Sequence, residues 1–260
     1  MPHFTDQTQR LINLPSVPQR IISLVPSQTE LLFDLGLNQE VIGITKFCVH
    51  PQEWFRTKTR IGGTKQVNIS LIDSLLPDLI IANKEENTKE DVDALSARYP
   101  VWTSDIHTID EAYEMIRAIG EIVNKAHTAK NIIDRSIAAF SSMDTSPCRS
   151  RVCYLIWQDP LMTIGNDTFI HAMLEAAGFI NVFAGKQRYP EITPQDLINQ
   201  TPDLVFLSSE PFPFQQKHID KFRQLLPHSK IILVDGEVFS WYGSRMIHAP
   251  GYFKQLRAKV

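Results

Sequence analysis

Few side chains in this sequence are spaced as a catalytic or metal-binding site would require. Cys48 and His50 are two soft metal ligands two positions apart, but a metal site needs three or four donors, so the pair alone is a weak signal. The adjacent carboxylates Glu85 and Glu86 fit a solvated loop better than a catalytic pair. The sequence also has no nucleophile elbow, Walker loop, zinc-protease motif or dinucleotide fingerprint. Nothing here demands catalysis, and we interpret the chain as a non-catalytic protein.

A second group of residues suits ligand binding. Trp157 and Trp241 each follow a predicted strand, and Trp241 opens the polar run WYGSR, which ends at Arg245. The other loops that follow predicted strands are also rich in aromatic, glycine and polar residues. Such a lining suits a large, flat, partly polar ligand. For Trp241, a core position and a ligand-facing position both remain open.

Alternating strands and helices must position these loops. A strand is predicted over Ile21 to Val25 and a helix after it, with Ser27 and Glu30 as a capping box and Gly36 at the helix end. Further strands of the first half are predicted at Val41 to Thr45, Leu79 to Ala82 and around Val101. This alternation is typical of a parallel α/β sheet.

From Thr108 the pattern changes to about 33 residues of helical periodicity, with Thr108 and Glu111 as a second capping box. The apolar residues recur at spacings of three and four, which predicts one helix roughly 50 Å long. A pair of helices with a break near Gly120 or Asn124 is the alternative.

The second half of the chain repeats the plan of the first. Strands are predicted at Arg151 to Trp157, Asp203 to Ser208 and Lys230 to Asp235, and helices at Asp167 to Ala177, capped by Asn166 or Asp167, and at Ile219 to Leu226. In each half a helix ends at a proline, an aspartate begins a strand, and a loop with a glutamate follows. We therefore divide the chain into a lobe at 1–107, a connecting long helix at 108–143 and a lobe at 144–260. Ligands of open α/β sheets bind beyond the carboxyl ends of the strands, so a cleft lined by the strand-end loops is expected.

Composition excludes several classes of protein. The 260 residues carry 26 basic and 29 acidic side chains mixed along the chain, so no basic stripe indicates nucleic acid. No apolar run approaches the ~20 residues of a membrane-spanning helix. Cys48, Cys148 and Cys153 suggest neither a disulfide framework nor a structural zinc site. The first twenty residues do not have the pattern of a secretion signal.

Several segments together resemble a known family. The stretch RIISLVPSQTELLFDLGL, with VIGIT, GGTKQVN and PDLII after it, is similar to the helical-backbone metal receptor superfamily. These are the class III substrate-binding proteins of ABC importers for cobalamin, haem and iron siderophores. The resemblance implies two Rossmann-like α/β lobes joined by a single long α-helix. The segments TKFCVHP, NKEENTKED, RYPE and FSWYGSR resemble a subgroup labelled cobalamin-binding-like.

The resemblance also implies a ligand and the residues that bind it. A cobalamin-like corrinoid is the expected ligand, with haem or a ferric siderophore as the next choices, and no cofactor is required. Lys65 or Arg245 would meet carboxylates or phosphate of the ligand. A monomer without a resident metal is expected. The predicted ligand-binding residues are Ser27, Gln28, Cys48, His50, Gly63, Thr64, Lys65, Trp157, Trp241, Tyr242, Gly243, Ser244 and Arg245.

The residues expected to contact a permease depart from the pattern of the family. Relatives present a surface glutamate to the permease before each PDL strand, and Ser70 and Gln195 stand there in this chain, with Asp73 and Asp196 nearby. The family role implies the cell envelope, whereas a native start at Met1 without a signal implies the cytoplasm.

Two rival functions follow. One is an intracellular metal- or cofactor-handling protein or enzyme that uses Cys48 and His50, with Glu85 or Tyr242. The other is an interaction module whose PFPF and FSWYGSR segments face a protein partner.

Overall fold

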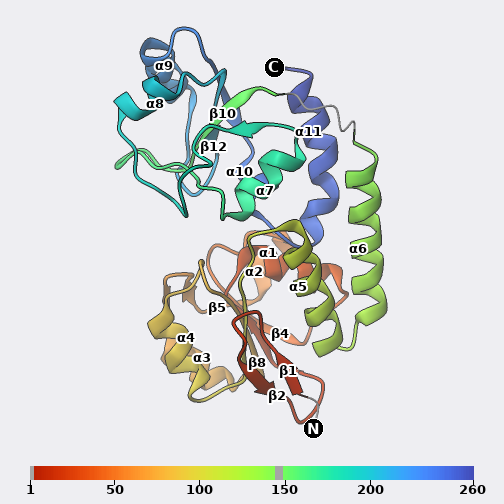
Figure 1. Cartoon of the computed structure of the whole chain (residues 1–260). Helices are drawn as coiled ribbons and strands as arrows, with labels where there is room; N and C mark the ends of the chain where they lie inside the picture. Colours follow the sequence, from red (N-terminus) through yellow and green to blue (C-terminus); the bar gives the residue numbers. More distant parts are fainter. Residues whose placement is uncertain (1–2, 144–148) are drawn as a thin grey trace. The chain divides into compact units, whose positions relative to one another are not determined.

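Both halves of the chain build parallel sheets flanked by helices, as the alternating pattern predicts (Figure 1). The computed structural model describes residues 3–143 and 149–260, so Cys148 lies outside the described residues. The chain divides into a first unit of Met1–Ile106, Asp110–Ser136 and Tyr242–Arg245, and a second unit of His107–Ile109, Ile137–Trp241 and Met246–Val260. Within the described ranges, none of the helices has the length and apolar character needed to cross a membrane.

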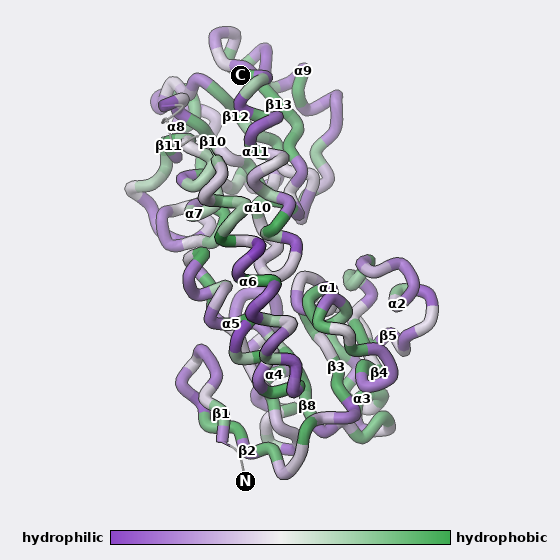
Figure 2. Tube along the Cα trace, turned by 90° about the vertical axis from the view of Figure 1, so that its right-hand side faces the viewer, coloured by the Kyte–Doolittle hydropathy of each residue, from purple (hydrophilic) through white to green (hydrophobic). Residues whose placement is uncertain are grey.

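The first unit contains a five-stranded sheet with the order β5-β4-β3-β8-β9, in which every neighbouring pair is parallel. Strands β3 and β8 are buried along their whole length and are hydrophobic in Figure 2, as strands covered on both faces should be. Its strands are β1 (His3–Thr5), β2 (Leu11–Asn13), β3 (Ile21–Ser23), β4 (Val41–Ile44), β5 (Thr59–Arg60), β6 (Gly62–Gly63), β7 (Gln66–Val67), β8 (Leu79–Asn83) and β9 (Val101–Ser104). The helices of this half are α1 (Pro26–Asp34), α2 (Gln52–Thr57), α3 (Ile69–Leu75), α4 (Lys89–Ser96), α5 (Ile109–Ile122) and α6 (Ala126–Ser141).

The second unit contains a four-stranded parallel sheet with the order β11-β10-β12-β13. Its core is built on Leu155, Val205 and Leu207 from the strands and Phe222 from a covering helix. The strands are β10 (Arg151–Leu155), β11 (Ile180–Asn181), β12 (Leu204–Ser208) and β13 (Lys230–Val234). The helices are α7 (Phe169–Ala176), α8 (Pro194–Gln200), α9 (Gln216–Leu225), α10 (Gly236–Ser240), the 3-10 helix η1 (Ser244–His248) and α11 (Ala249–Arg257).

The predicted repeat of the two halves is present in the strand order and in one hydrogen-bonded motif. If the edge strand β5 of the first sheet is left aside, the two sheets have the same strand order. The first reads β4-β3-β8-β9 and the second β11-β10-β12-β13, so in each the second strand along the chain lies at the edge next to the first. The backbone N–H of Arg20 donates to Asp78 at 2.8 Å, and that of Arg151 donates to Asp203 at 2.7 Å. The same arginines donate through their side chains to the carbonyls of Leu75 and Gln200. These carbonyls end α3 and α8, so each arginine satisfies a helix terminus that the helix itself leaves unpaired.

The single long helix is the part of the predicted fold that is wrong. The segment forms two helices, α5 and α6, which Figure 1 shows running antiparallel. Asn124 adopts the left-handed conformation at the turn, with φ of 56°. The helices touch closely, because a Cβ added to Gly120 would lie 2.3 Å from the Cβ of Ala129. The alternative of two helices is therefore correct. Periodicity missed the break because both helices present an apolar stripe and only Asn124 has a strong preference for this turn.

Two predicted helix caps are also wrong, while one helix end is confirmed. Helix α1 begins at Pro26 after Val25, so Ser27 lies inside the helix and makes no capping box with Glu30. Helix α7 is capped by Thr168, whose side chain accepts from the N–H of His171, rather than by Asn166 or Asp167. Gly36 follows the end of α1 with φ of 84°, the conformation that glycine adopts without strain.

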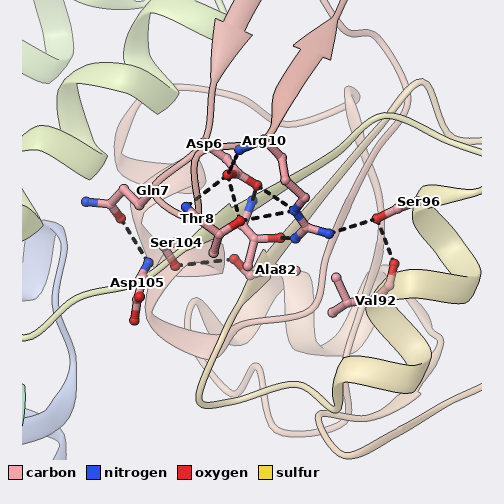
Figure 3. Close-up of polar contacts among 10 residues, drawn as sticks. Asp6, Gln7, Thr8, Arg10, Ala82, Val92, Ser96, Ser104 and Asp105 are labelled. Carbon is pink, nitrogen blue, oxygen red and sulfur yellow. Dashed lines mark hydrogen bonds and ion pairs between the residues drawn. The ribbon is translucent and has the colours of Figure 1, made fainter.

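A buried aspartate attaches the N-terminal hairpin β1-β2 to the edge strand β9 (Figure 3). The Asp6 carboxylate accepts from the backbone N–H groups of Thr8 and Arg10 at 2.9 Å and from that of Thr103 at 3.2 Å. Its side chain has no exposed surface, and the Arg10 guanidinium neutralises it at 3.3 Å. This contact holds the carboxyl end of β9, where Ser104 lies.

Candidate functional site

At the carboxyl end of β8, side-chain amides hold a rigid loop. The Asn83 Oδ1 accepts from the backbone N–H groups of Glu85 at 2.8 Å and Glu86 at 2.9 Å. Asn87 closes the loop, because its Oδ1 accepts from the Asn83 N–H and its Nδ2 donates to the carbonyl of Thr64. Asn83 at the end of β8 and Asn87 after it thus fix both Glu86 and the β6-β7 turn, and a polar loop with a glutamate follows the strand as predicted.

Beneath this loop, Ser104 is the centre of a buried polar network. Its Oγ accepts from the Gln28 Nε2 at 2.5 Å and from the Asn83 Nδ2 at 3.0 Å, and it donates to the carbonyl of Ala82. Gln28 has no exposed surface. Its Oε1 is enclosed without a hydrogen-bond partner among the described residues. Gln28 therefore belongs to the support of the site rather than to its surface.

The segment Tyr242–Arg245 belongs to the first unit, although it follows most of the second unit in the sequence. Arg245 makes two hydrogen bonds of 2.8 Å to the Glu30 carboxylate on α1, a bidentate ion pair. Gly243 has φ of 113° and packs against Leu31, so a left-handed residue is required there. Ser244 is 4% exposed. The predicted cation Arg245 is thus committed to the protein itself.

Tyr242 is 7% exposed and its phenol lies in the polar interior of the first unit. Burial raises the pKa of Tyr242 well above its usual range, the charge of Glu86 adds to this, and hydrogen bonds with Ser27 and Ser104 oppose it. Tyr242 is therefore a neutral phenol that links the 242–245 segment to the network around Ser104.

The loop after β4 contains the predicted residues Cys48 and His50, and it orients them differently from their neighbour Phe47. The Cys48 thiol has no exposed surface and accepts from the Thr29 Oγ1 at 3.1 Å. Burial raises the pKa of the Cys48 thiol, which keeps it protonated and unreactive. His50 is half-buried. Phe47 is instead 51% exposed. It was not among the predicted residues, because the metal-ligand types of Cys48 and His50 were the signal used for this loop.

The β6-β7 turn lies beside Phe47. A Cβ added to Gly63 would lie 3.3 Å from the Phe47 ring, so glycine allows the ring to approach the backbone. Thr64 is 8% exposed and its carbonyl accepts from Asn87. The Lys65 Nζ donates to the backbone carbonyl of Glu85. Of the three predicted residues in this turn, Lys65 is the one with an exposed side chain.

In the second unit the two predicted tryptophans differ. Trp157 is 37% exposed, its Nε1 donates to the Asp159 carbonyl at 3.0 Å, and its ring makes an edge contact with Phe212. Trp241 is 6% exposed, and its Nε1 donates to the Glu210 carboxylate at 2.8 Å. The core interpretation of Trp241 therefore holds, and Trp157 carries the accessible indole.

In the part of the chain that the structure describes, the predicted residues neither form a cluster of metal-ligating types nor line either of the two hollows below. Across 3–143 and 149–260, no three His, Cys, Asp or Glu side chains lie together as metal ligands. Two hollows of about 580 and 700 Å³ open on the second unit, one beside Lys254 and Arg257 and one beside Leu161 and Phe222, and neither is lined by a predicted site residue. The enclosed Cys48 thiol likewise offers no nucleophile to the enzyme alternative.

Sheets of this order, with the helices that flank them, define the fold of class III substrate-binding proteins. A family model described as periplasmic binding protein matches residues 21–225, and the chain belongs to this family.

The chain is also similar to individual proteins. A cobalamin-binding protein of Halobacterium salinarum is 30% identical over 210 residues, which cover 77% of this chain and 56% of that protein. The chain thus spans little more than half the length of that relative. An ABC transporter substrate-binding lipoprotein of Bacillus subtilis is 25% identical over 256 residues, covering 93% of this chain and 81% of that protein. The crystal structure of a vitamin B12-binding protein of Vibrio cholerae has a TM-score of 0.74 and 20% identity, covering 95% of this chain and all of that one, a likeness of fold.

Proposed function

We propose that this chain is a non-catalytic solute-binding protein of the ABC-importer type and that its ligand is a cobalamin-like corrinoid. Membership of the periplasmic binding protein family supports the binding role, and the Bacillus subtilis relative carries a name of that kind. The cobalamin-binding name of the Halobacterium salinarum relative supports the corrinoid. This role implies a location in the cell envelope.

The observation that carries the corrinoid proposal is an exposed aromatic ring on a strand-end loop of each unit. Phe47 follows β4 and Trp157 follows β10, with 51% and 37% of their surface exposed. An exposed aromatic ring on a folded protein is a ready contact for a flat apolar ligand, which would remove the remaining exposed area of the ring from water. Corrin is a wide, nearly flat macrocycle, so it offers a matching surface to an exposed aromatic ring of either unit.

Other predicted residues have supporting roles in this proposal. Gln28 holds the base of the first unit's loops through Ser104, Ser27 and Tyr242 lie near this network, and Cys48 is a core residue. Lys65 fixes the β6-β7 turn to the loop after β8. Affinity would come mainly from buried aromatic and apolar area and orientation from a few polar contacts.

A titration of the purified chain tests this function. Cobalamin, cobinamide, haem and a ferric siderophore would be compared by absorbance and thermal shift. A ligand at ~100 times its Kd stabilises the folded protein by about 2.7 kcal/mol, which is easily measured. A saturable shift with the corrinoids is expected. If neither corrinoid gives a saturable shift, the proposed corrinoid ligand is wrong. If none of the four ligands gives one, the proposed binding role is wrong.

Substitution of the two exposed rings then tests the site. Phe47→Ala and Trp157→Ala are each expected to weaken corrinoid binding about ten-fold or more, since each removes a large apolar contact. Phe33→Ala is the matched control, because Phe33 is a 36% exposed ring at the far end of α1. Equal affinity of all three variants with the unaltered chain would remove the aromatic contacts from the proposal.

An ABC permease is the partner that this role implies, and its docking would differ from the paired-carboxylate pattern. Ser70 and Gln195 are both exposed and occupy the second position of the equivalent helices α3 and α8. The nearby Asp73 binds Arg98 and Tyr99, and Asp196 closes the capping box of α8 with Thr193. Docking through neutral side chains should depend weakly on ionic strength. A steep loss of permease binding between 50 and 500 mM salt would contradict this.

A further inference from the structure

Several cations of the first unit already have an oxygen partner within the protein. The Arg245 guanidinium is held by both carboxylate oxygens of Glu30. Lys84, in the loop after β8, pairs with the Asp105 carboxylate at 2.5 Å. The Lys65 ammonium donates to a backbone carbonyl of the same loop. A ligand anion that approached any of these groups would share the cation with an existing partner.

Lys46, in the loop after β4, is different. Its side chain is exposed, and its ammonium lies 5.1 Å from the centroid of the Phe47 ring. Among the residues that the structure describes, this ammonium forms neither an ion pair nor a hydrogen bond. A cation–π contact is a weak electrostatic attraction to the ring face, so all three N–H donors of the ammonium stay available to an acceptor. Lys46 is thus a cation with its charge uncompensated by any carboxylate of the described residues.

The β6-β7 turn holds Lys46 and Phe47 beside each other. The backbone N–H of Lys46 donates to the Gly62 carbonyl at 2.9 Å. A Cβ added to Gly63 would lie 3.3 Å from the Phe47 ring and 3.4 Å from the Lys46 Cε. Both side chains therefore pack on the same glycine, which places an ammonium next to an exposed aromatic ring.

We propose that Lys46 and Phe47 form a subsite that selects corrinoids carrying a phosphate, with the macrocycle against the ring and the phosphate on the ammonium. Corrin is much wider than a phenyl ring, so a macrocycle in contact with Phe47 brings the substituents of its rim near the Lys46 ammonium. In a cobalamin-like corrinoid the ring side chains are amides, and the phosphate of the nucleotide arm is the anionic group. Hydrogen bonds between an ammonium and a phosphate are stronger than those between neutral groups.

Lys46 then takes the role that was predicted for Lys65 or Arg245, both of which are held by oxygens of the protein. This inference rests on the proposed corrinoid-binding function. It adds the anionic substituent that the ligand carries and the residue that selects it.

Two corrinoids that differ by one phosphate isolate the effect. Cobinamide has no phosphate, and cobinamide phosphate carries one at the end of the same arm. Their dissociation constants would be measured by absorbance titration at pH 7.5 and 50 mM salt, where screening is modest. The unaltered chain should bind cobinamide phosphate about five-fold more tightly, the effect of one partly exposed charge pair. The preference should decrease at 500 mM salt.

Three variants assign the preference to Lys46. Lys46→Met keeps the aliphatic stem and removes the charge, so the two dissociation constants should become about equal. Lys46→Arg should retain the preference. Lys58→Met is the matched control, because the Lys58 ammonium also lies near a ring, 5.2 Å from that of Trp54, but donates to the carbonyl of Asn38, which precedes β4. This control should leave the ratio unchanged, and a thermal melt checks that all three variants fold.

The outcomes separate this inference from the function on which it rests. Equal binding of the two corrinoids by the unaltered chain, or a ratio that Lys46→Met leaves unchanged, would overturn the inference and leave the corrinoid function intact. An equal loss of preference in Lys58→Met would also overturn it, because the effect would then not depend on the position of the charge. Binding of neither corrinoid would overturn both the inference and the proposed function.

Discussion

The two units share a scaffold and differ in what they place at the carboxyl ends of their strands. Each has the same order of four strands and the same arginine–aspartate contact between a helix end and a strand. At the strand ends, the first unit has an amide and hydroxyl network around Ser104, while the second has Tyr154 and Glu210 beside packed aromatic rings. The repeated contacts therefore support the fold, and the contacts that are not repeated give the strand ends of each unit a different chemistry.

The aspartates of the repeated contact offer the largest expected difference. Asp78 is half-buried and accepts from the N–H groups of Gln19 and Arg20, whereas Asp203 is exposed and accepts from Arg151. Asp78→Ala should lower the free energy of unfolding by about 2 kcal/mol and Asp203→Ala by about 1 kcal/mol, since hydrogen bonds to a charged group weaken with exposure. Urea unfolding of the purified variants measures both.

Hydrogen exchange assigns each loss to its unit. Asp78→Ala should speed amide exchange in β3 and β8, and Asp203→Ala in β10 and β12. Equal losses of stability, or faster exchange spread over both sheets, would show that the contact does not act locally in each unit.

The strands and the repeat could be predicted from the sequence because they depend on local signals. Apolar runs bounded by polar residues located β3, β8, β10, β12 and β13 to within a few residues. The Pro77-Asp78 and Pro202-Asp203 pairs identified equivalent helix ends, and Leu76 and Thr201 both adopt the left-handed conformation before them. These features follow from residues close together in the chain.

The failures concern contacts between distant residues. The break at Asn124 depends on α6 packing back on α5, as the contact between Tyr113 and Ser136 shows. Pairing of Glu30 with Arg245, 215 positions away, is likewise invisible to a local capping motif. The orientation of Phe47 outward and Cys48 inward depends on Thr29 from another element. Residue type alone therefore favoured Cys48 as a site residue, whereas the fold buries Cys48 and exposes Phe47.

Each unit buries a tyrosine near its strand ends. Removing either hydroxyl should cause a loss of stability of intermediate size, and the two losses can be compared. The Tyr242 hydroxyl is buried near the hydroxyls of Ser27 and Ser104, and the Tyr154 hydroxyl lies 3.1 Å from the Ser208 Oγ. Tyr242→Phe should cost about 1–2 kcal/mol because it affects two buried hydroxyls. Tyr154→Phe should cost about 0.5–1 kcal/mol, since Ser208 keeps the Glu210 N–H as a partner. Thermal unfolding compares the two, and a larger loss for Tyr154→Phe would contradict the view that the first unit depends more on its polar network.

The smallest expected effect is a pH dependence confined to the second unit. His218 is buried, its Nδ1 accepts from the Gln215 N–H at 2.7 Å at the start of α9, and its ring contacts Phe212 and Phe214. Burial lowers the pKa of His218, and the charges of Lys217 and Lys221 lower it further. The unfolded chain, with an ordinary histidine pKa of about 6.5, then binds more protons than the folded one as pH falls through this range. Stability should therefore decrease below about pH 6.5 and level off below the folded pKa.

The variant His218→Gln keeps an acceptor for the helix start but does not titrate. Its urea midpoint relative to the unaltered chain should rise between pH 7.5 and pH 5.5, because only the unaltered chain loses the contribution of a neutral imidazole. His228→Gln, at an exposed histidine after α9, is the matched control and should show no such change. If the urea midpoints of His218→Gln and the unaltered chain differ by the same amount at both pH values, protonation of His218 does not affect stability in this range.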